Sequence, residues 1–220
     1  MTGIKEAVSA GSARKALARV VLLARIEFHN STDLSDSRLL SLCNVGISGW
    51  AVGTLKLYVR YSRGADFSGT CMYASRRIYV NLGRHVTYPY RMQTLLARAK
   101  TVGRRWYKPS CTVILGDGYQ VVLFVFMHEL YHLLVKRAGR NIRQKESMCD
   151  RFAARFLADR FGAAVRGPGG RCVPRGEWDF QDLDGFVAAA RDRRAAPRSA
   201  RSRAAPPVPL HGRQLLLFPD

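Results

Sequence analysis

The sequence is poor in lysine, has no long apolar run and shows no regular spacing of cysteine. Its five cysteines, at positions 43, 71, 111, 149 and 172, are odd in number and never form a CxxC pair. This pattern argues against a disulfide scaffold or a cysteine zinc knuckle and favours a reducing compartment. The longest apolar run, residues 121–127, is far short of a membrane span, and the apolar patch at 20–24 is too short and too late for a secretory signal. We therefore expect a cytoplasmic protein without a membrane segment.

Acidic residues are also scarce. Sixteen Asp and Glu face 36 Lys and Arg in a chain of 220 residues, which gives a net charge of +20, and only seven of the basic residues are lysine. A surplus carried by arginine suits contact with a polyanion, because the guanidinium group is a planar fork that matches phosphate. The codon usage of a GC-rich genome would also favour arginine over lysine, so both explanations stay open.

The composition, 47% hydrophobic and 24% charged, excludes wholesale disorder. We expect one α+β domain over residues 1–190 and a disordered Arg/Pro-rich tail over 191–220. Alternating strands are expected at 54–61 and 77–82, joined through Gly64 and Gly69 as an antiparallel sheet with one solvated face, and a further strand at 111–115. Helices are expected at 12–28, after Ser35 or Asp36, at 120–136, at 143–161 and at 179–191.

His128-Glu129-Leu130-Tyr131-His132 is an HExxH motif. On a helix, residues i and i+4 lie on one face, so both imidazoles can reach a single Zn²⁺. The glutamate between them projects beside the metal, where it can act as general base toward bound water. Seven apolar residues lead into the motif, as expected for a buried helix. Two structural histidines flanking a surface glutamate would not explain that setting.

A catalytic zinc needs a third protein ligand, and no histidine follows His132 before His211 in the tail. The candidates are Glu146, Cys149 and Asp150 on the next helix. Glu146 and Asp150 share one face, so Glu146 can ligate the metal while Asp150 orients a ligand histidine. Glu146 could instead be an ordinary solvated residue near Lys145.

Residues 120–161, with HELYH followed by ESMCDRFAARFLAD, resemble small gluzincin-type metallopeptidases, especially the ImmA/IrrE group. The resemblance implies a zincin-like fold: a small curled sheet under the HExxH helix, with the glutamate helix alongside. Glu146, Cys149, Asp150, Phe152 and Ala153 fall on the group's conserved places. The usual Leu-Leu-Met-Pro ending is replaced here by residues 156–159. The short interval between His132 and Glu146 is similar to SprT-like proteases, which act on proteins attached to DNA but use a third histidine.

Residues 67–116 contain nine Lys and Arg and no Asp or Glu, interleaved with tyrosines and a tryptophan. Cations for phosphates and aromatic faces for bases are typical of single-stranded nucleic-acid binding, although a solvated arginine-rich face would look similar. The candidate nucleic-acid residues are Arg76, Arg77, Arg104, Arg105 and Lys108, and the expected partner is single- or double-stranded DNA.

The chain ends in Gln214-Leu215-Leu216-Leu217-Phe218. This peptide is similar to QLxLF, by which bacterial replication and repair proteins bind the β sliding clamp, and Gln214, Leu215, Leu217 and Phe218 are its candidate contacts. It could equally pack back on the domain.

The sequence thus predicts a zinc metallopeptidase acting on a DNA-associated protein or a repressor, with Glu129 as base and His128, His132 and Glu146 as ligands. The alternative is a non-catalytic, zinc-containing adaptor that binds nucleic acid and is recruited through its C-terminal peptide. Tyr88, Tyr90 and Tyr131 are the tyrosines considered for stabilising an oxyanion.

Overall fold

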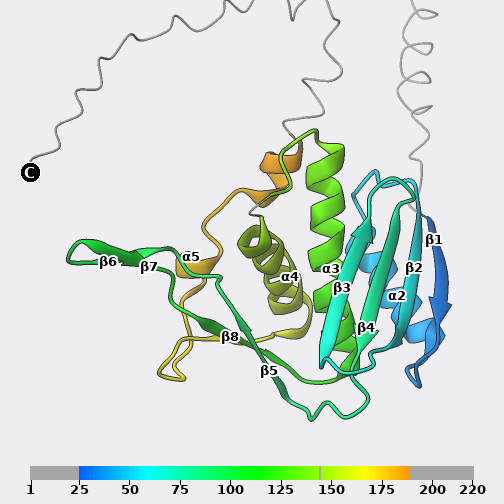
Figure 1. Cartoon of the computed structure of the whole chain (residues 1–220), viewed down its shortest axis with the longest axis horizontal. Helices are drawn as coiled ribbons and strands as arrows, with labels where there is room; N and C mark the ends of the chain where they lie inside the picture. Colours follow the sequence, from blue (N-terminus) through cyan, green and yellow to red (C-terminus); the bar gives the residue numbers. More distant parts are fainter. Residues whose placement is uncertain (1–24, 144, 189–220) are drawn as a thin grey trace, which may run out of the picture.

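The computed structural model describes residues 25–143 and 145–188, and this part is a mixed α+β domain of helices and small sheets. The α+β class is therefore confirmed. Figure 1 shows two helices, α3 and α4, in the middle of the molecule, with the largest sheet on one side of them and a projecting hairpin on the other. In chain order the elements are β1 (Arg25–Asn30), α2 (Asp36–Ile47), β2 (Thr54–Tyr61), β3 (Phe67–Met72), β4 (Arg77–Leu82), β5 (Tyr90–Thr94), β6 (Lys100–Val102), β7 (Arg105–Tyr107), β8 (Cys111–Leu115), α3 (Gly118–Arg137), α4 (Glu146–Phe161), β9 (Val165–Arg166) and α5 (Arg175–Trp178).

The largest sheet has the strand order β1-β2-β4-β3. β1 and β2 are parallel, β2 and β4 are parallel, and only the edge strand β3 is antiparallel to its neighbour β4. The expected antiparallel pairing of 54–61 with 77–82 is therefore wrong. The chain leaves β2, passes to the edge as β3 and returns through a hairpin, which inserts β4 beside β2 in the same direction. Period-2 alternation identifies a strand and its buried face but carries no information on strand direction.

One face of this sheet forms the core with α3. Leu55, Leu57 and Val59 on β2, with Ile78 and Val80 on β4, are almost completely buried. α3 is buried on nearly all sides, which explains why its apolar residues show no helical periodicity. By length and composition α3 could cross a membrane, but 83% of that segment is buried inside the protein, as in the core helix of a soluble domain.

The two central helices begin and end where local chemistry favours it. Asp117 caps α3, its side chain accepting a hydrogen bond from the backbone N–H of Gln120 at 2.9 Å. α4 starts at Glu146, three residues later than expected, and ends at Gly162, whose φ of 66° is the left-handed conformation that glycine tolerates. Ser35 caps α2, so the expected helix there is confirmed.

β5, β8 and β9 form a second sheet with antiparallel pairing, and β6 and β7 form a separate two-stranded hairpin. The strand expected at 111–115 is β8. The segment between β5 and β6 is fastened to α4: the Arg151 side chain, which is buried, donates to the carbonyl oxygen of Leu96 at 2.8 Å. The hairpin therefore leaves the domain from a fixed base.

Three other expectations need correction. The helix expected at 12–28 is wrong for residues 25–28, which belong to β1: Ile26 faces the core and pairs with Leu55. Gly69 lies inside β3, opposite Val80, and not in a connection. The helix expected at 179–191 follows α5 and begins at residue 183, not at 179. The expected tail (191–220) and its C-terminal peptide lie outside the described residues.

Candidate metal centre

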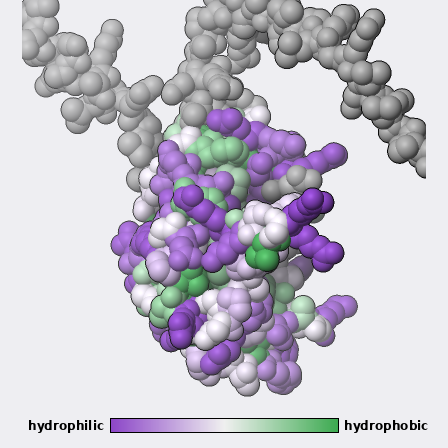
Figure 2. Space-filling view, turned by 90° about the vertical axis from the view of Figure 1, so that its left-hand side faces the viewer, coloured by the Kyte–Doolittle hydropathy of each residue, from purple (hydrophilic) through white to green (hydrophobic). Residues whose placement is uncertain are grey.

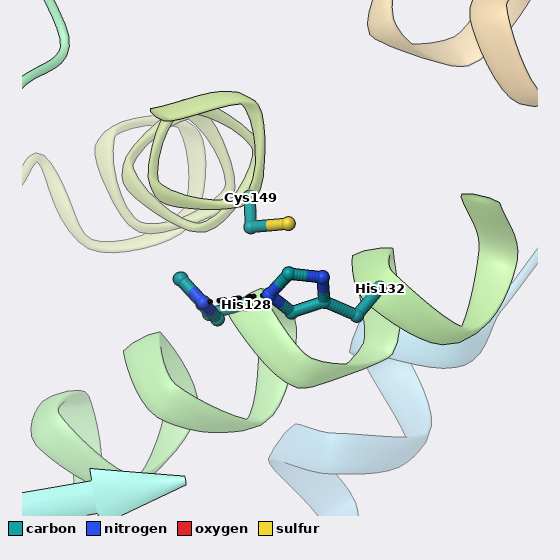
Figure 3. A group of neighbouring side chains, drawn as sticks. All are labelled: His128, His132 and Cys149. Carbon is teal, nitrogen blue, oxygen red and sulfur yellow. Dashed lines mark hydrogen bonds between the residues drawn. The ribbon is translucent and has the colours of Figure 1, made fainter. Parts of the chain in front are cut away.

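His128 and His132 project from the same face of α3 toward α4 (Figure 3). Their Nε2 atoms are 3.1 Å apart, and their side chains are only 16% and 10% exposed. The i, i+4 spacing places them one above the other, and burial on the α4 side holds both rings in place. The expected pair of imidazoles thus converges on one point.

Glu146, in the first turn of α4, brings its carboxylate to the same point. Its Oε2 lies 3.2 Å from His128 Nε2 and its Oε1 lies 3.3 Å from His132 Nε2. Ligands that bind zinc at 2.0–2.2 Å in a tetrahedron are about 3.3–3.5 Å apart. The two histidine nitrogens are separated by nearly such a distance, and each faces one oxygen of the Glu146 carboxylate at a similar separation. Two imidazoles with a carboxylate are a donor set that zinc accepts. The residues therefore fit the metal that the motif predicts.

Asp150, one turn further along α4, fixes the orientation of His128. Its Oδ1 lies 2.8 Å from His128 Nδ1, and its Oδ2 accepts a short hydrogen bond from the hydroxyl of Thr94. Burial lowers the pKa of His128, but the Asp150 carboxylate, together with the charges of Glu129 and Glu146, outweighs burial and leaves that pKa above its ordinary value. With the carboxylate on Nδ1, the Nε2 lone pair is the one free to face a metal. Asp150 thus lies where the expected orienting residue should be.

His132 is held differently. Its Nδ1 is buried and has no hydrogen-bond partner among the residues that the structure describes. Burial and the neighbouring His128 lower the pKa of His132, which favours the neutral imidazole. The carboxylate that contacts this ring is that of Glu146, on Nε2 and not on Nδ1.

Glu129 lies beside the pair and is 9% exposed. Burial raises the pKa of its carboxyl, and the positive charge of His128 opposes that shift. β3 passes so close that a Cβ atom built on Gly69 would lie 2.4 Å from Glu129 Oε1 and 2.7 Å from Val125 Cγ1. Glycine at this position therefore leaves room for the carboxylate, which sequence reasoning about Gly69 missed.

A cavity of about 200 Å³ opens next to His128 and Glu129. β3, β5 and α3 enclose it, and apolar side chains supply much of its wall. Its lining residues are Phe67, Gly69, Met92, Gln93, Thr94, Phe124, Val125, His128, Glu129 and Asp150. The site thus has a small pocket of its own for a ligand or a substrate side chain.

Cys149 is a second possible metal ligand. Its side chain is fully buried, and its sulfur and one nitrogen of each histidine all lie within 4.8 Å of one another (Figure 3). Burial raises the pKa of this thiol, and the carboxylates of Glu146 and Asp150 raise it further. The Glu146 oxygens lie 3.2 and 3.3 Å from the histidine nitrogens, and the Cys149 sulfur lies within 4.8 Å of them, so the geometry offers two candidates for the third ligand.

The tyrosines considered for an oxyanion role are badly placed. Tyr131 is buried and donates its hydroxyl to the carbonyl oxygen of Leu183, while the hydroxyl of Tyr90 donates to Asp66. Tyr88 lies against Gly118, about three helical turns before His128.

Tyr73, just after β3, has its hydroxyl closer to Glu129 than these tyrosines do. Burial raises the pKa of its hydroxyl most, followed by Cys71 and then by the charges of Glu129 and other site residues. Nothing in the sequence distinguishes it from the other tyrosines.

The five candidate nucleic-acid residues fall into two groups. Arg76 and Arg77 lie at the turn between β3 and β4, whereas Arg104, Arg105 and Lys108 belong to the β6–β7 hairpin and its base. Figure 1 shows α3 and α4 between these two regions. The basic stretch that is continuous in the sequence is therefore divided between two regions of the fold.

No protein-family model, no curated protein and no solved structure matches the chain.

Proposed function

We propose that the chain is a zinc-dependent metallopeptidase of zincin-like fold, related to the ImmA/IrrE or SprT-like proteases that its motifs resemble. The observation that carries the proposal is the convergence of His128, His132 and Glu146 at separations of 3.1–3.3 Å, with a buried glutamate beside them. A structural reading of the two histidines leaves this convergence unexplained. The protein would act in the cytoplasm, as its unpaired cysteines suggest.

The residues have distinct roles in this proposal. Zinc held by His128, His132 and Glu146 would supply Lewis-acid polarisation of a carbonyl oxygen and make water a better nucleophile. Glu129 accepts a proton from the water that attacks the peptide carbonyl and returns it to the leaving amine as the C–N bond breaks. A buried carboxyl with a raised pKa suits both transfers. Asp150 keeps His128 in the tautomer that ligates.

β3 supports a peptide substrate. It is the edge strand of its sheet in the order β1-β2-β4-β3, and it passes directly over Glu129 at Gly69. An edge strand presents unpaired backbone N–H and C=O groups to which an extended peptide can add. The adjoining cavity of about 200 Å³ can receive one apolar side chain. A peptide docked in this way would carry its backbone past the base.

One observation favours the alternative, a non-catalytic adaptor. If Cys149 completed a four-ligand set with the histidines and Glu146, no open position would remain for water, as in structural zinc sites. Cobalt substitution distinguishes a ligand set that includes Cys149 from one that does not. A thiolate ligand gives a charge-transfer absorption, which Cys149→Ser would abolish. Glu146→Ala should weaken zinc binding strongly if Glu146 is the third ligand, whereas unchanged zinc content would assign that place to Cys149 or Asp150.

The decisive experiment compares the wild type with Glu129→Gln. Both should copurify with about one zinc per chain and share one melting temperature, because glutamine has the size of glutamate. Cleavage of labelled casein, and of the chain itself, should be lost in Glu129→Gln because an amide cannot accept the proton. Equal cleavage by the two proteins would refute the mechanism. Zinc without cleavage in either protein would favour the adaptor.

Two further expectations remain proposals from the sequence. A DNA-associated protein or a repressor is the proposed substrate, and the C-terminal peptide with Gln214, Leu215, Leu217 and Phe218 is proposed to bind the β sliding clamp. That peptide lies outside the described residues, so its recruitment role depends on the motif alone.

A further inference from the structure

The β6–β7 hairpin exposes large apolar side chains. All six of its strand residues are exposed, and the exposed fractions of Val102, Trp106 and Tyr107 are 66%, 71% and 48%. The two strands turn at Gly103, whose φ of 59° puts a glycine at the first position of a two-residue turn. A lone two-stranded ribbon gains little stability from burial. Aromatic residues held in water on such a ribbon indicate a surface that binds something.

The hairpin and its base are strongly basic. Residues 98–108 contain Arg98, Lys100, Arg104, Arg105 and Lys108 and no acidic residue. Lys100 lies 3.8 Å from Glu177, but within the described chain neither Arg104 nor Arg105 has an acidic partner. Figure 2, which faces this side of the molecule, shows mostly hydrophilic residues with small, separate hydrophobic patches. The unpaired cations together with the exposed rings suit a ligand that is anionic and has flat apolar faces.

The pairing sets which side chains share a face. Tyr107 lies opposite Lys100 and Arg105 lies opposite Val102, so one face of the ribbon places a ring between cations. Trp106 lies on the other face, opposite Thr101. Neither ring has a ring or cation contact with any described residue, and most of the Trp106 ring and about half of Tyr107 are open to stacking.

The base of the hairpin is fastened to the helix that carries Glu146 and Asp150. Lys108 donates to the hydroxyl of Ser147 at 3.4 Å, and Ser147 directly follows Glu146. On the other side of the hairpin, at the end of β5, Thr94 donates to Asp150, and in the segment between β5 and β6 the Leu96 carbonyl oxygen accepts from Arg151. A ligand held on the hairpin would therefore lie at a defined position relative to the metal centre.

We infer that the β6–β7 hairpin binds single-stranded DNA, with its cations on the phosphates and Trp106 and Tyr107 stacked on bases. Open ring faces fit unpaired bases, whereas the bases of a duplex are already stacked on each other. Proteins distinguish RNA through its 2′-hydroxyl, and the hairpin strands carry only the hydroxyls of Thr101 and Tyr107 as neutral polar groups. The DNA would present its bound proteins to the metal centre, a consequence that rests on the proposed peptidase activity.

The test uses the zinc-loaded full chain carrying Glu129→Gln, so binding is measured without cleavage. The probe is a fluorescent oligo(dT), titrated at several salt concentrations. Arg104→Gln with Arg105→Gln should weaken binding and flatten the log-log salt slope by about 1.4, since each contact to a single strand contributes roughly 0.7. Binding is assigned to the hairpin, which leaves out Arg76 and Arg77, the two sequence candidates that lie at the β3–β4 turn. The matched control, Arg76→Gln with Arg77→Gln, removes the same charge from that turn and should leave the slope unchanged. An equal loss from both pairs would reduce the effect to net charge and overturn the inference.

Trp106 supplies the second measurement. Trp106→Ala should weaken oligo(dT) binding roughly 5- to 150-fold, the range for one stacked base, while Trp106→Phe retains most of the affinity. DNA should also change the tryptophan emission of the parent protein but not of Trp106→Phe, since Trp178 is buried and the half-buried Trp50 packs edge-on against Phe152. Melting temperatures should not change, because the hairpin residues are exposed. Tighter binding to duplex DNA or to oligo(U), or binding through these residues to phosphatidylserine vesicles without binding to DNA, would refute the inference.

Failure of this proposal and failure of the peptidase proposal are distinguishable. Binding to oligo(dT) through the hairpin without any cleavage by the wild type would leave the inference standing and remove the peptidase. Cleavage by the wild type without hairpin-dependent DNA binding would do the reverse.

Discussion

His132 lies on a helix that is buried on nearly every side, whereas each strand residue of the β6–β7 hairpin is exposed to water. The metal centre gathers carboxylates in a small space, and the hairpin gathers cations and rings on an open ribbon. A centre that holds a metal needs fixed separations, which tight packing supplies. A surface that binds a long polymer needs accessible groups, which packing would remove.

α4 joins the two regions, because it carries Glu146 and Asp150 toward α3 and contacts the base of the hairpin through Ser147 and Arg151. The contacts to the hairpin end at its base, so changes at the tip should not reach the metal. Substitutions at the centre should alter metal binding and cleavage and leave DNA binding intact. Three changes at the centre test this independence.

The largest effect is expected from His132→Ala. Loss of one of three ligands should lower zinc affinity by more than about 100-fold, because even residues that only orient a ligand contribute 10- to 100-fold. Metal analysis of the purified protein and competition with a chelator measure the change. Affinity for oligo(dT) serves as the control and should match the wild type. A joint loss of zinc and DNA binding would show that the two regions are coupled.

Gly69→Ala should abolish most of the cleavage and keep the metal. The added methyl group would lie 2.4 Å from Glu129 Oε1, so the carboxylate must move. A displacement of about 1 Å can lower a rate about 100-fold, and overpacking costs roughly 1–3 kcal/mol of stability. Gly64→Ala is the matched control, since nothing lies within 4 Å of its added Cβ. Activity and zinc content are compared for both variants, and an active Gly69→Ala enzyme would contradict the role of Glu129.

Asp150→Asn should have the smallest effect of the three. The amide keeps the size of the side chain but loses the charge that orients His128 Nδ1, so zinc affinity should fall about 10- to 100-fold. Thr94→Val removes the other hydrogen bond of Asp150 and should weaken zinc binding less. Zinc competition titrations rank the two variants. If Asp150→Asn kept the wild-type affinity for zinc, packing alone would orient His128.

The central helices could be predicted because their determinants are local. The HExxH spacing and the seven apolar residues before it fix α3, and the spacing of Glu146 and Asp150 identifies the face of α4 that approaches it. The cap at Ser35 similarly places α2. Each of these features depends on residues within a few turns of one another, so the spacing of side chains in the sequence is enough to predict it.

Sheet connectivity could not be predicted, because alternation is the same for parallel and antiparallel strands. The insertion of β4 between β2 and β3 depends on long-range pairing, which no short pattern encodes. Gly69 was misjudged for the same reason: its neighbour, Glu129, is 60 positions away in the chain. The division of the basic stretch into two regions also follows from tertiary structure, since α3 and α4 come later in the sequence than either group.

The burial of α3 also bears on the stability of the metal-free protein in a cell. A zinc finger cannot fold without its metal, because it has little else to hold it together. α3 instead packs through apolar side chains such as Phe126 and Leu130 on surfaces that no metal helps to form. We therefore expect the metal-free chain to be folded and long-lived, since degradation follows the unfolded fraction. If the proposed zinc-dependent activity is correct, scarcity of zinc would then silence the protein without depleting it, and activity could return with the metal before any new synthesis.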